Sequence, residues 1–291
     1  MTLSVPQSRS ADGTGGTLRV LQSEDLPALR ALLRRDPDAY VVVSERIEAG
    51  ALIPAASGGQ SWGWFTGAGL ESAIYLGANT IPIETTEASR WAFAQRLTRG
   101  GRRSSAIVGH HHEVLPLWEL LAASWGPCRE IRGDQPLMAL EHTPEHSVDF
   151  RVKVADEADL EPLMPASIAM FTEEVGVSPV SGGREAGYRA RLLESIRAGR
   201  VFTRIERGEV IFKAEVGAVS TASSQLQGVW VTPRLRQTGL AAPAVAGVVR
   251  LSMLQHARRI SLYANAHNTA ALRTYARVGF RQTGTFATVL F

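Results

Sequence analysis

The sequence predicts an α/β protein made of two similar units in tandem. Its 291 residues are about twice the length of an ordinary domain, so two compact units are expected. Hydrophobic residues make up 45% and charged residues 20%, a balance typical of globular proteins that bury a core. In addition, the strand and helix patterns of the first half are followed by a second set in the same order.

Apolar residues at helical or alternating spacing give the elements of the first half. In order, these are a strand at 18–21, a helix carrying Leu26, Leu29, Leu32 and Leu33, a helical stretch after Asp38, strands at 62–66, 72–76 and 80–84, a helix at 87–97, a strand at 104–108, a helix at 114–123 and an apolar run at 136–140. We expect an N-terminal domain at 17–143, preceded by a disordered tail at 1–16 that is rich in Ser, Gly and Thr.

The second half, expected to form a domain at 144–291, repeats this order after a linker-like stretch that contains Pro144. Its elements are a strand at 150–154, helices at 156–171 and 184–198, strands at 201–206, 209–216 and 225–232, a helix ending near 257, a strand at 260–264, a helix at 269–277 and a closing strand at 285–291. Arg207 and Gly208 lie between two strands and predict a hairpin turn.

Charge and cysteine content exclude several classes of protein. The formal net charge is only +3, and the arginines that dominate the 31 basic residues form no run, so a nucleic-acid-binding stripe is not indicated. Cys128 is the only cysteine, which excludes an intramolecular disulfide and a thiolate zinc site and fits a reducing, cytoplasmic setting. No apolar run reaches the 18 residues typical of a membrane span, so no membrane contact is expected.

The segment VWVTPRLRQTGLA at 229–241 combines a strand, a proline and a turn into a helix at Gly239. The first N–H groups of a helix lack intrahelical acceptors, and with the helix dipole they can bind an anion. Gly239 and Ala241 keep the approach to these groups open, and Pro243 falls in the first helical turn, where its missing N–H breaks no bond. The segment therefore predicts a phosphate cradle. An ordinary strand-turn-helix connection is the alternative.

The segment LYANAHNTAALRTYARVGF at 262–280 makes the pattern specific. Asn268, Ala271, Tyr275 and the final Gly-Phe fit N-x-x-A-x-x-x-Y-x-x-x-G-F, and the first segment fits V-x-V-x-P-x-x-R-x-x-G-x-A. Both are patterns of the GNAT superfamily of N-acetyltransferases, which the C-terminal half resembles. The resemblance implies two tandem GNAT-like domains, each a mixed, mostly antiparallel central sheet flanked by helices, with acetyl-CoA as cosubstrate.

The resemblance also implies which residues hold acetyl-CoA. In the family, the strand backbone pairs with the pantetheine arm, the loop amides hold the pyrophosphate, and an asparagine touches the cofactor. The matching residues are Val229, Trp230, Val231, Arg236, Gln237, Thr238, Gly239, Leu240, Ala241, Ala242 and Asn268. No metal ion is implied.

Tyr275 matches the family tyrosine that protonates the departing thiolate. Aminolysis of a thioester needs a proton for the sulfur, which a nearby phenol can supply, although a lone tyrosine on a helix is more often a core residue. The general base is not evident, because 262–267 contains no carboxylate. Glu215 and Glu174, together with Glu173, are candidates, but each could equally be a solvated or ion-paired side chain. A water relay is the other route.

The N-terminal half lacks a phosphate-loop motif after 81–83, so we expect a degenerate copy without cofactor. It resembles the uncharacterised domain that precedes GNAT domains in some actinobacterial-type proteins. The triplet at 110–112 consists of three histidines, but neighbouring side chains on a strand or loop point apart, so no metal site is predicted.

The expected function is transfer of an acetyl group to a primary amine of a small molecule or protein by direct attack, with Tyr275 as general acid. Three alternatives stay open. The first is a CoA-binding sensor without catalysis, the second is a mycothiol-synthase-like acetyltransferase, and the third is an aminoacyl-tRNA-dependent transferase, which the scattered arginines and the intact loop disfavour. The acceptor cannot be identified from the sequence, and a homodimer is left open.

Overall fold

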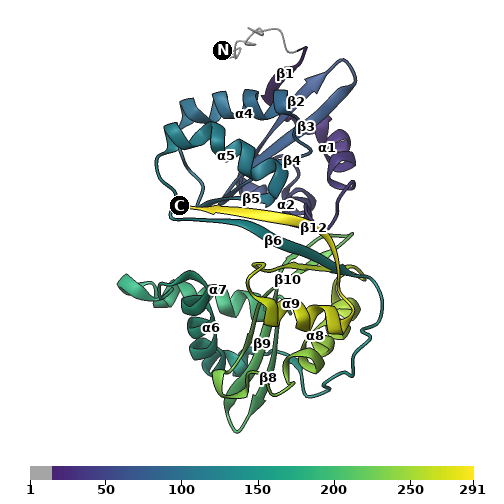
Figure 1. The fold of residues 1–291 in the computed structure, drawn as a ribbon, viewed down its shortest axis with the longest axis vertical. Coiled ribbons are helices and arrows are strands. Elements are labelled where there is room, and N and C mark those ends of the chain that lie inside the picture. Colours follow the sequence, from purple (N-terminus) through teal and green to yellow (C-terminus); the bar gives the residue numbers. More distant parts are fainter. Residues whose placement is uncertain (1–14) are drawn as a thin grey trace. The chain divides into compact units, whose positions relative to one another are not determined.

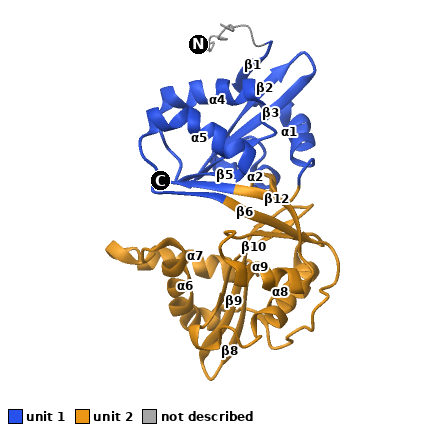
Figure 2. Ribbon diagram, viewed as in Figure 1, with its two compact units in different colours: residues 1–36, 46–133, 287–291 blue, residues 37–45, 134–286 orange. Residues whose placement is uncertain are grey.

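The computed structural model describes residues 15–291, so nearly all of the tail expected at 1–16 lies outside the described residues. The chain forms two compact units, which Figure 2 distinguishes by colour. The first comprises the residues up to Asp36, 46–133 and 287–291, and the second comprises 37–45 and 134–286. Each unit therefore contains segments from both halves of the sequence.

The first unit is a sheet covered by helices (Figure 1). Its elements are β1 (Thr17–Val20), α1 (Leu26–Leu33), α3 (Pro54–Ser57), β2 (Gln60–Thr66), β3 (Gly69–Leu76), β4 (Asn79–Ile83), α4 (Glu87–Gly100), β5 (Ala106–His110) and α5 (His111–Trp125). The strands lie in the order β1-β2-β3-β4-β5, antiparallel except for the parallel pair β4–β5.

Local sequence explains where the helices of this unit begin and what they bury. Helix α1 places Leu29, Leu32 and Leu33 on one face, and all three are buried. Helix α4 begins at a reciprocal cap in which the Thr86 hydroxyl accepts from the Ser89 amide and the Ser89 hydroxyl accepts from the Thr86 amide. The apolar faces of α4 and α5 meet in one core around Phe93.

The second unit contains most of the remaining elements. They are β7 (Lys153–Val154), α6 (Leu160–Val175), α7 (Glu185–Arg197), β8 (Val201–Glu206), β9 (Glu209–Val219), β10 (Ser224–Val231), α8 (Ala241–Gln255), β11 (Ile260–Tyr263) and α9 (Thr269–Val278). Three elements are divided between the units, namely α2 (Val41–Gly50), β6 (Glu130–Leu140) and β12 (Arg281–Leu290).

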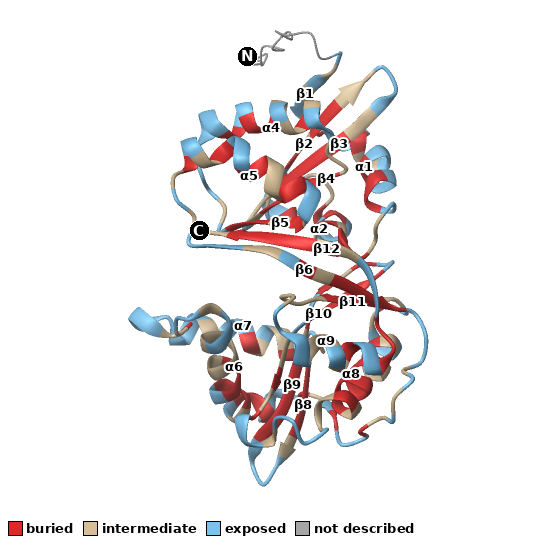
Figure 3. Cartoon of the chain, in the orientation of Figure 1, coloured by how far each residue is buried: buried red, intermediate tan, exposed pale blue. Residues whose placement is uncertain are grey.

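The sheet of the second unit follows the order β6-β11-β10-β9-β8-β7. The β10–β11 pair of this sheet is parallel, and the pairs β6–β11, β7–β8, β8–β9 and β9–β10 are antiparallel. One face packs against α8 and α9 in a large apolar core, and the other packs against α6 and α7 in a smaller one. Figure 3 shows the strands buried beneath helices with exposed outer faces. The mixed, mostly antiparallel sheets confirm the predicted fold class.

Most predicted elements occur within a few residues of their expected bounds, and the hairpin turn at Arg207 and Gly208 is present with both residues at positive φ. Three expectations were wrong. Helix α8 begins at Ala241 rather than at Gly239, the strand expected at 150–154 is only Lys153–Val154, and the second and third histidines of the 110–112 triplet open helix α5 instead of lying on a strand or loop.

None of the helices formed by residues 15–291 combines the length and apolarity that crossing a membrane requires.

Candidate active site

Strand β10 carries a bulge where the cofactor-binding backbone was predicted. Its ladder with β9 pairs Gln227 with Glu215 and Trp230 with Lys213. Two residues on β10 therefore lie opposite a single residue on β9. One of them is Gly228, at φ +57°. A β-bulge redirects main-chain groups away from the ladder and frequently marks an active site.

On its other side, β10 soon parts from β11. The parallel register contains only Ser224 with Ile260 and Gln225 with Ser261. From Leu226 onward, the main-chain groups of β10 that face away from β9 have no partner on β11 in the described ladder. This opening between two strands leaves the predicted backbone at Val229, Trp230 and Val231 able to pair with an extended ligand.

The chain after β10 turns twice through unusual backbone conformations before α8 begins. Pro233 starts a short 3₁₀ turn, and then Gln237 and Gly239 adopt positive φ values of +63° and +88°. The Nε of Arg236 donates to the Val231 carbonyl at 3.1 Å, which ties the loop back to the end of the strand. Gly239 tolerates its conformation because it has no Cβ.

This loop presents a run of unpaired amides. Among the described residues, no acceptor is found for the main-chain N–H groups of 237–242, and the first helical bond of α8 runs from the Ala244 amide to the Leu240 carbonyl at 3.3 Å. Leu240 at the N-cap supplies no side-chain acceptor. The start of α8 therefore offers consecutive donors at the positive end of a helix dipole, which is an arrangement that binds phosphate.

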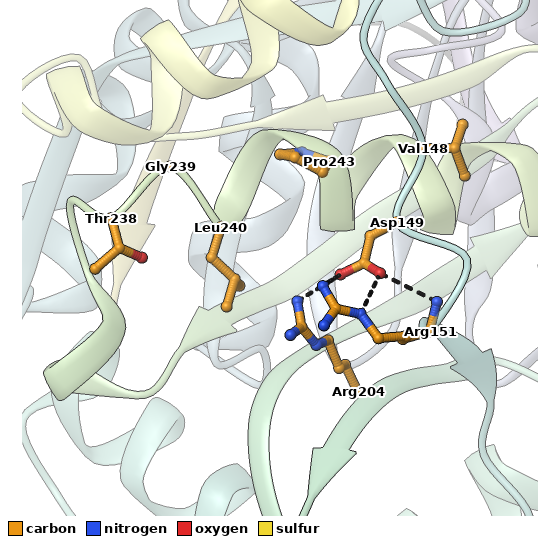
Figure 4. A pocket seen from close by; sticks show the side chains of 8 residues that line it. All are labelled: Val148, Asp149, Arg151, Arg204, Thr238, Gly239, Leu240 and Pro243. Carbon is orange, nitrogen blue, oxygen red and sulfur yellow. Dashed lines mark hydrogen bonds and ion pairs between the residues drawn. The ribbon is translucent and has the colours of Figure 1, made fainter.

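A cavity of about 410 Å³ lies beside the loop, as Figure 4 shows. Thr238, Gly239 and Leu240 line it on one side, and Arg151 and Arg204 line it on the other around the carboxylate of Asp149. Arg204 is buried and lies 2.6 Å from Asp149, whereas Arg151 is 67% exposed. Burial alone would raise the pKa of Asp149, but hydrogen bonds from Arg151 and the charge of Arg204 hold that pKa below its usual range.

Glu173, near the end of α6, connects this loop to the opposite face of the sheet. One carboxylate oxygen accepts from the Trp230 indole nitrogen at 3.3 Å, and the other pairs with Arg236 at 2.7 Å. Glu173 thus links α6, strand β10 and the phosphate-binding loop. This use of the carboxylate was not evident from the sequence, which left Glu173 as a candidate base.

The two residues taken from the second motif lie on α9. Asn268 is the N-cap of that helix, and its side-chain oxygen accepts from the Ala271 amide at 3.2 Å, so the side chain already stabilises the helix start. Tyr275 is 7% exposed and packs against Phe280, with ring centroids 6.0 Å apart. Burial, and then the negative charge of Glu174, raise the pKa of the Tyr275 phenol, which keeps it protonated at neutral pH.

A second cavity, of about 430 Å³, opens on the α6–α7 face of the same sheet. It brings together the two candidate bases, Glu215 from β9 and Glu174 from α6, with Tyr188 and Arg191 from α7. Its floor includes Gln227 and Gly228 at the bulge, so it meets β10 where that strand leaves its ladder. Burial and the charge of Glu215 raise the pKa of Tyr188 to about 12, and its hydroxyl donates to the Ser167 carbonyl.

Lys213 lies fully buried beneath this cavity and was not predicted. Its ammonium forms an ion pair with Glu215, two residues along the same face of β9. A Cβ added at Gly228 would lie 3.7 Å from the Lys213 nitrogen, so the charge sits close to the bulge. The signal in the sequence was a lysine inside the apolar run VIFKAEV of a chain with only one other lysine.

The corresponding place in the first unit is occupied by the protein's own side chains. There α4 follows β4 as α8 follows β10, but the Thr85 amide donates to the carboxylate of Glu113, and Thr86 and Ser89 cap the helix reciprocally. Glu113 is 1% exposed, and burial raises its pKa. A protein carboxylate thus takes one of the amides that an anionic ligand would need, and side-chain hydroxyls take two others.

The histidine triplet forms a different cluster. His110 pairs with Asp36 at 2.9 Å, and its ring stacks on that of His112 at a centroid distance of 5.1 Å. Within 15–291, no three His, Cys, Asp or Glu side chains come together in a group able to hold a metal ion.

Two family models match the chain. Residues 59–163 match a domain of unknown function (DUF4081), and residues 188–280 match the acetyltransferase (GNAT) family. The second match includes the bulge, the loop, the start of α8 and Tyr275. A search of curated proteins found no match.

Solved structures similar to this chain share its fold along nearly its whole length. A GNAT-family acetyltransferase from Colwellia psychrerythraea has a TM-score of 0.54 at 13% identity, covering 94% of this chain and 99% of that chain. A GCN5-related N-acetyltransferase from Sphaerobacter thermophilus has a TM-score of 0.57 at 12% identity, covering 96% of both chains. A tandem GNAT protein from the clavulanic acid biosynthesis pathway has a TM-score of 0.50 at 13% identity, covering 94% of this chain and 98% of that chain.

The fold therefore comprises two GNAT-like domains in tandem, and residues 188–280 of the second match the acetyltransferase (GNAT) family.

Proposed function

We propose that the second unit transfers an acetyl group from acetyl-CoA to a primary amine. The observation that carries the proposal is the run of unpaired amides at 237–242, which ends the strand-turn-helix segment of a GNAT-family domain. A pyrophosphate satisfies several such donors at once without needing a metal ion.

The residues around the loop fit the cosubstrate. The amides of 237–242 would hold the pyrophosphate, and Arg151, which is paired with Asp149 and Glu206, lies largely exposed beside the loop. The open edge of β10 at Val229, Trp230 and Val231 would pair with the amides of the pantetheine arm. Asn268 keeps its side-chain amide nitrogen available while its oxygen caps α9, so contact with the cofactor is compatible with its structural role.

The cavity on the α6–α7 face would hold the acceptor. A neutral amine there adds to the acetyl carbonyl carbon, the carbon–sulfur bond breaks, the amine nitrogen loses a proton and the thiolate gains one. Main-chain N–H groups near the bulge at Gly228 can stabilise the developing oxyanion. Tyr275, whose phenol is protonated at neutral pH, supplies the proton to sulfur.

Glu174 and Glu215 would attract the amine as a cation and accept its proton, directly or through water. Glu215 is already paired with the buried ammonium of Lys213, and this pairing limits its use as a base. The same ion pair favours a second candidate function, a CoA-binding sensor without turnover, in which Glu215 serves structure alone.

Two measurements separate these functions. Calorimetric titration with CoA tests the cofactor loop, and absence of saturable binding would sink both candidates. A mass-spectrometric screen of a metabolite and peptide extract, incubated with the protein and isotope-labelled acetyl-CoA, tests transfer. Labelled amides that form only with the protein present support the enzyme, whereas tight CoA binding without any labelled product supports the sensor.

A further inference from the structure

The first unit contains a cavity of about 430 Å³ that is unrelated to its capped helix start. It lies where β4 begins and α4 ends, at Thr80, Gly100 and Gly101. The Thr85 amide, which donates to Glu113, follows the C-terminal end of β4, the opposite end from the cavity. The cavity is therefore not the counterpart of the cofactor loop of the second unit.

Three arginines line this cavity without a carboxylate among the lining residues. Arg96 and Arg99 come from the C-terminal part of α4, Arg99 from its last turn, and Arg103 comes from the loop that follows. All three are exposed, and none forms an ion pair within the described chain. Because no acid pairs with them in the described chain, this group leaves a concentration of positive charge.

The remaining wall of the cavity is apolar and aromatic. Trp62 and Leu76 come from the sheet, Leu97 from α4 and Trp125 from the end of α5. The Arg96 guanidinium lies 5.4 Å from the centroid of the Trp62 ring. The Trp125 indole nitrogen is buried and has no hydrogen-bond acceptor among the described residues.

The loop between α4 and β5 adds main-chain donors to the arginines. Gly101 turns the chain at φ +68°, and the N–H groups of 101–104 have no acceptor within the described part of the protein. Ser104 also lines the cavity, and its hydroxyl accepts from Thr80 at 2.9 Å, which leaves the Ser104 hydrogen free to donate. Arginines, loop amides and a hydroxyl together suit a multivalent oxyanion.

We propose that the first unit binds a small phosphate ester whose organic part is a flat, apolar ring. The ring would lie against Trp62 and Trp125, and the phosphate would bind Arg99, Arg103 and the loop amides. This site goes beyond acetyl transfer and does not depend on the activity of the second unit. It gives a ligand-binding role to a unit whose own helix start is closed by Glu113.

The test titrates the full chain calorimetrically with 1-naphthyl phosphate, and in parallel with 1-naphthol and with inorganic phosphate. The expected result is saturable binding of the ester, at least about tenfold tighter than that of either part, because both the ring and the charge contribute. Arg99→Gln combined with Arg103→Gln should weaken this binding by about tenfold or more.

The matched control is Arg30→Gln combined with Arg34→Gln on and after α1, since these two arginines are also exposed, unpaired in the described chain and outside the cavity. It removes the same charge and should change binding by less than about twofold. Thermal melts of both double variants establish that they are folded.

Three outcomes would overturn the proposal. They are no saturable binding into the millimolar range, equal weakening by both double variants, and displacement of the ester by excess CoA. Failure of CoA to bind at all would count against the acetyltransferase assignment alone, because the arginine variants still report on the cavity of the first unit.

Discussion

Replacing Gly239 by alanine should weaken CoA binding without destabilising the protein. Gly239 has φ +88°, and an L-residue in the left-handed region costs about 1–2 kcal/mol. A Cβ at this position would meet no atom within 4 Å, and the residue is exposed. Because no neighbouring atom packs against this position, the variant loop should relax locally to negative φ when it is free.

The cost then appears when the ligand restores the aligned amides. A penalty of about 1–2 kcal/mol corresponds to roughly a fivefold to thirtyfold loss of CoA affinity, measured by calorimetric titration. The free energy of unfolding of the unliganded protein should change by less than about 0.5 kcal/mol, since the exposed loop relaxes and makes no packed contact.

Gly208→Ala is the matched control, because Gly208 also has positive φ, +79°, and open space around it. Here the ladder between β8 and β9 fixes the turn, so the same strain should lower stability by about 1 kcal/mol, or a few degrees in Tm, and leave CoA affinity unchanged. If both variants bind CoA equally well, or if Gly239→Ala loses stability instead of affinity, the loop is not the phosphate site described above.

Four further outcomes are expected. Tyr275→Phe should lower kcat by about a hundredfold in the acetylation assay. CoA affinity and Tm should stay within error, because the buried phenol has no hydrogen-bond partner in the described chain and the ring packing is kept. A change in kcat of less than about threefold would exclude Tyr275 as the acid. Glu173→Gln should weaken CoA binding by up to about fivefold, as an exposed ion pair to the loop is lost, and high salt should have the same effect on the wild type. Arg259→Ala should reduce the free energy of unfolding in denaturant by about 3 kcal/mol, because it strips the 1%-exposed Asp38 of a bidentate partner; an unchanged midpoint would contradict this. The Tm of Glu113→Gln, relative to that of the wild type, should rise from pH 5 to pH 8. A carboxyl with a raised folded-state pKa stabilises the wild type below its unfolded-state pKa, and that contribution is lost as the pH rises. A Tm difference that does not depend on pH would refute the burial argument.

Local chemistry made much of the fold predictable. The Arg207-Gly208 turn, the capped start of α9 at Asn268 and the proline-glycine loop before α8 all depend on residues close in sequence. The early part of β6 and the start of β12 were missed because their side chains are exposed and polar, so no apolar alternation marks them.

The candidate site was predictable only as far as its motifs reach. The loop at 237–242 and Tyr275 lie in segments that match family patterns. Glu173, Lys213 and Glu215 lie outside those patterns, and their contacts were not predicted. Glu173 meets Trp230 and Arg236 across 57 and 63 residues of sequence, and such pairings depend on the tertiary structure alone. Lys213 was also missed because lysine is almost always a surface residue, whereas Lys213 is fully buried.

The division of strands between the units has a consequence for biosynthesis. Residues 287–291 complete the sheet of the first unit, where the Phe291 amide donates to the Ser105 carbonyl, yet they are synthesised after the whole of the second unit. Similarly, the ion pair of Asp38 cannot form until Arg259, which is 221 residues downstream, has been synthesised. The first unit therefore cannot finish folding on the ribosome before the second has been translated, and such distant pairings slow folding. A cut near residue 143 would leave each fragment without a strand or an ion-pair partner that the other carries, so both units need the uncut chain to fold completely.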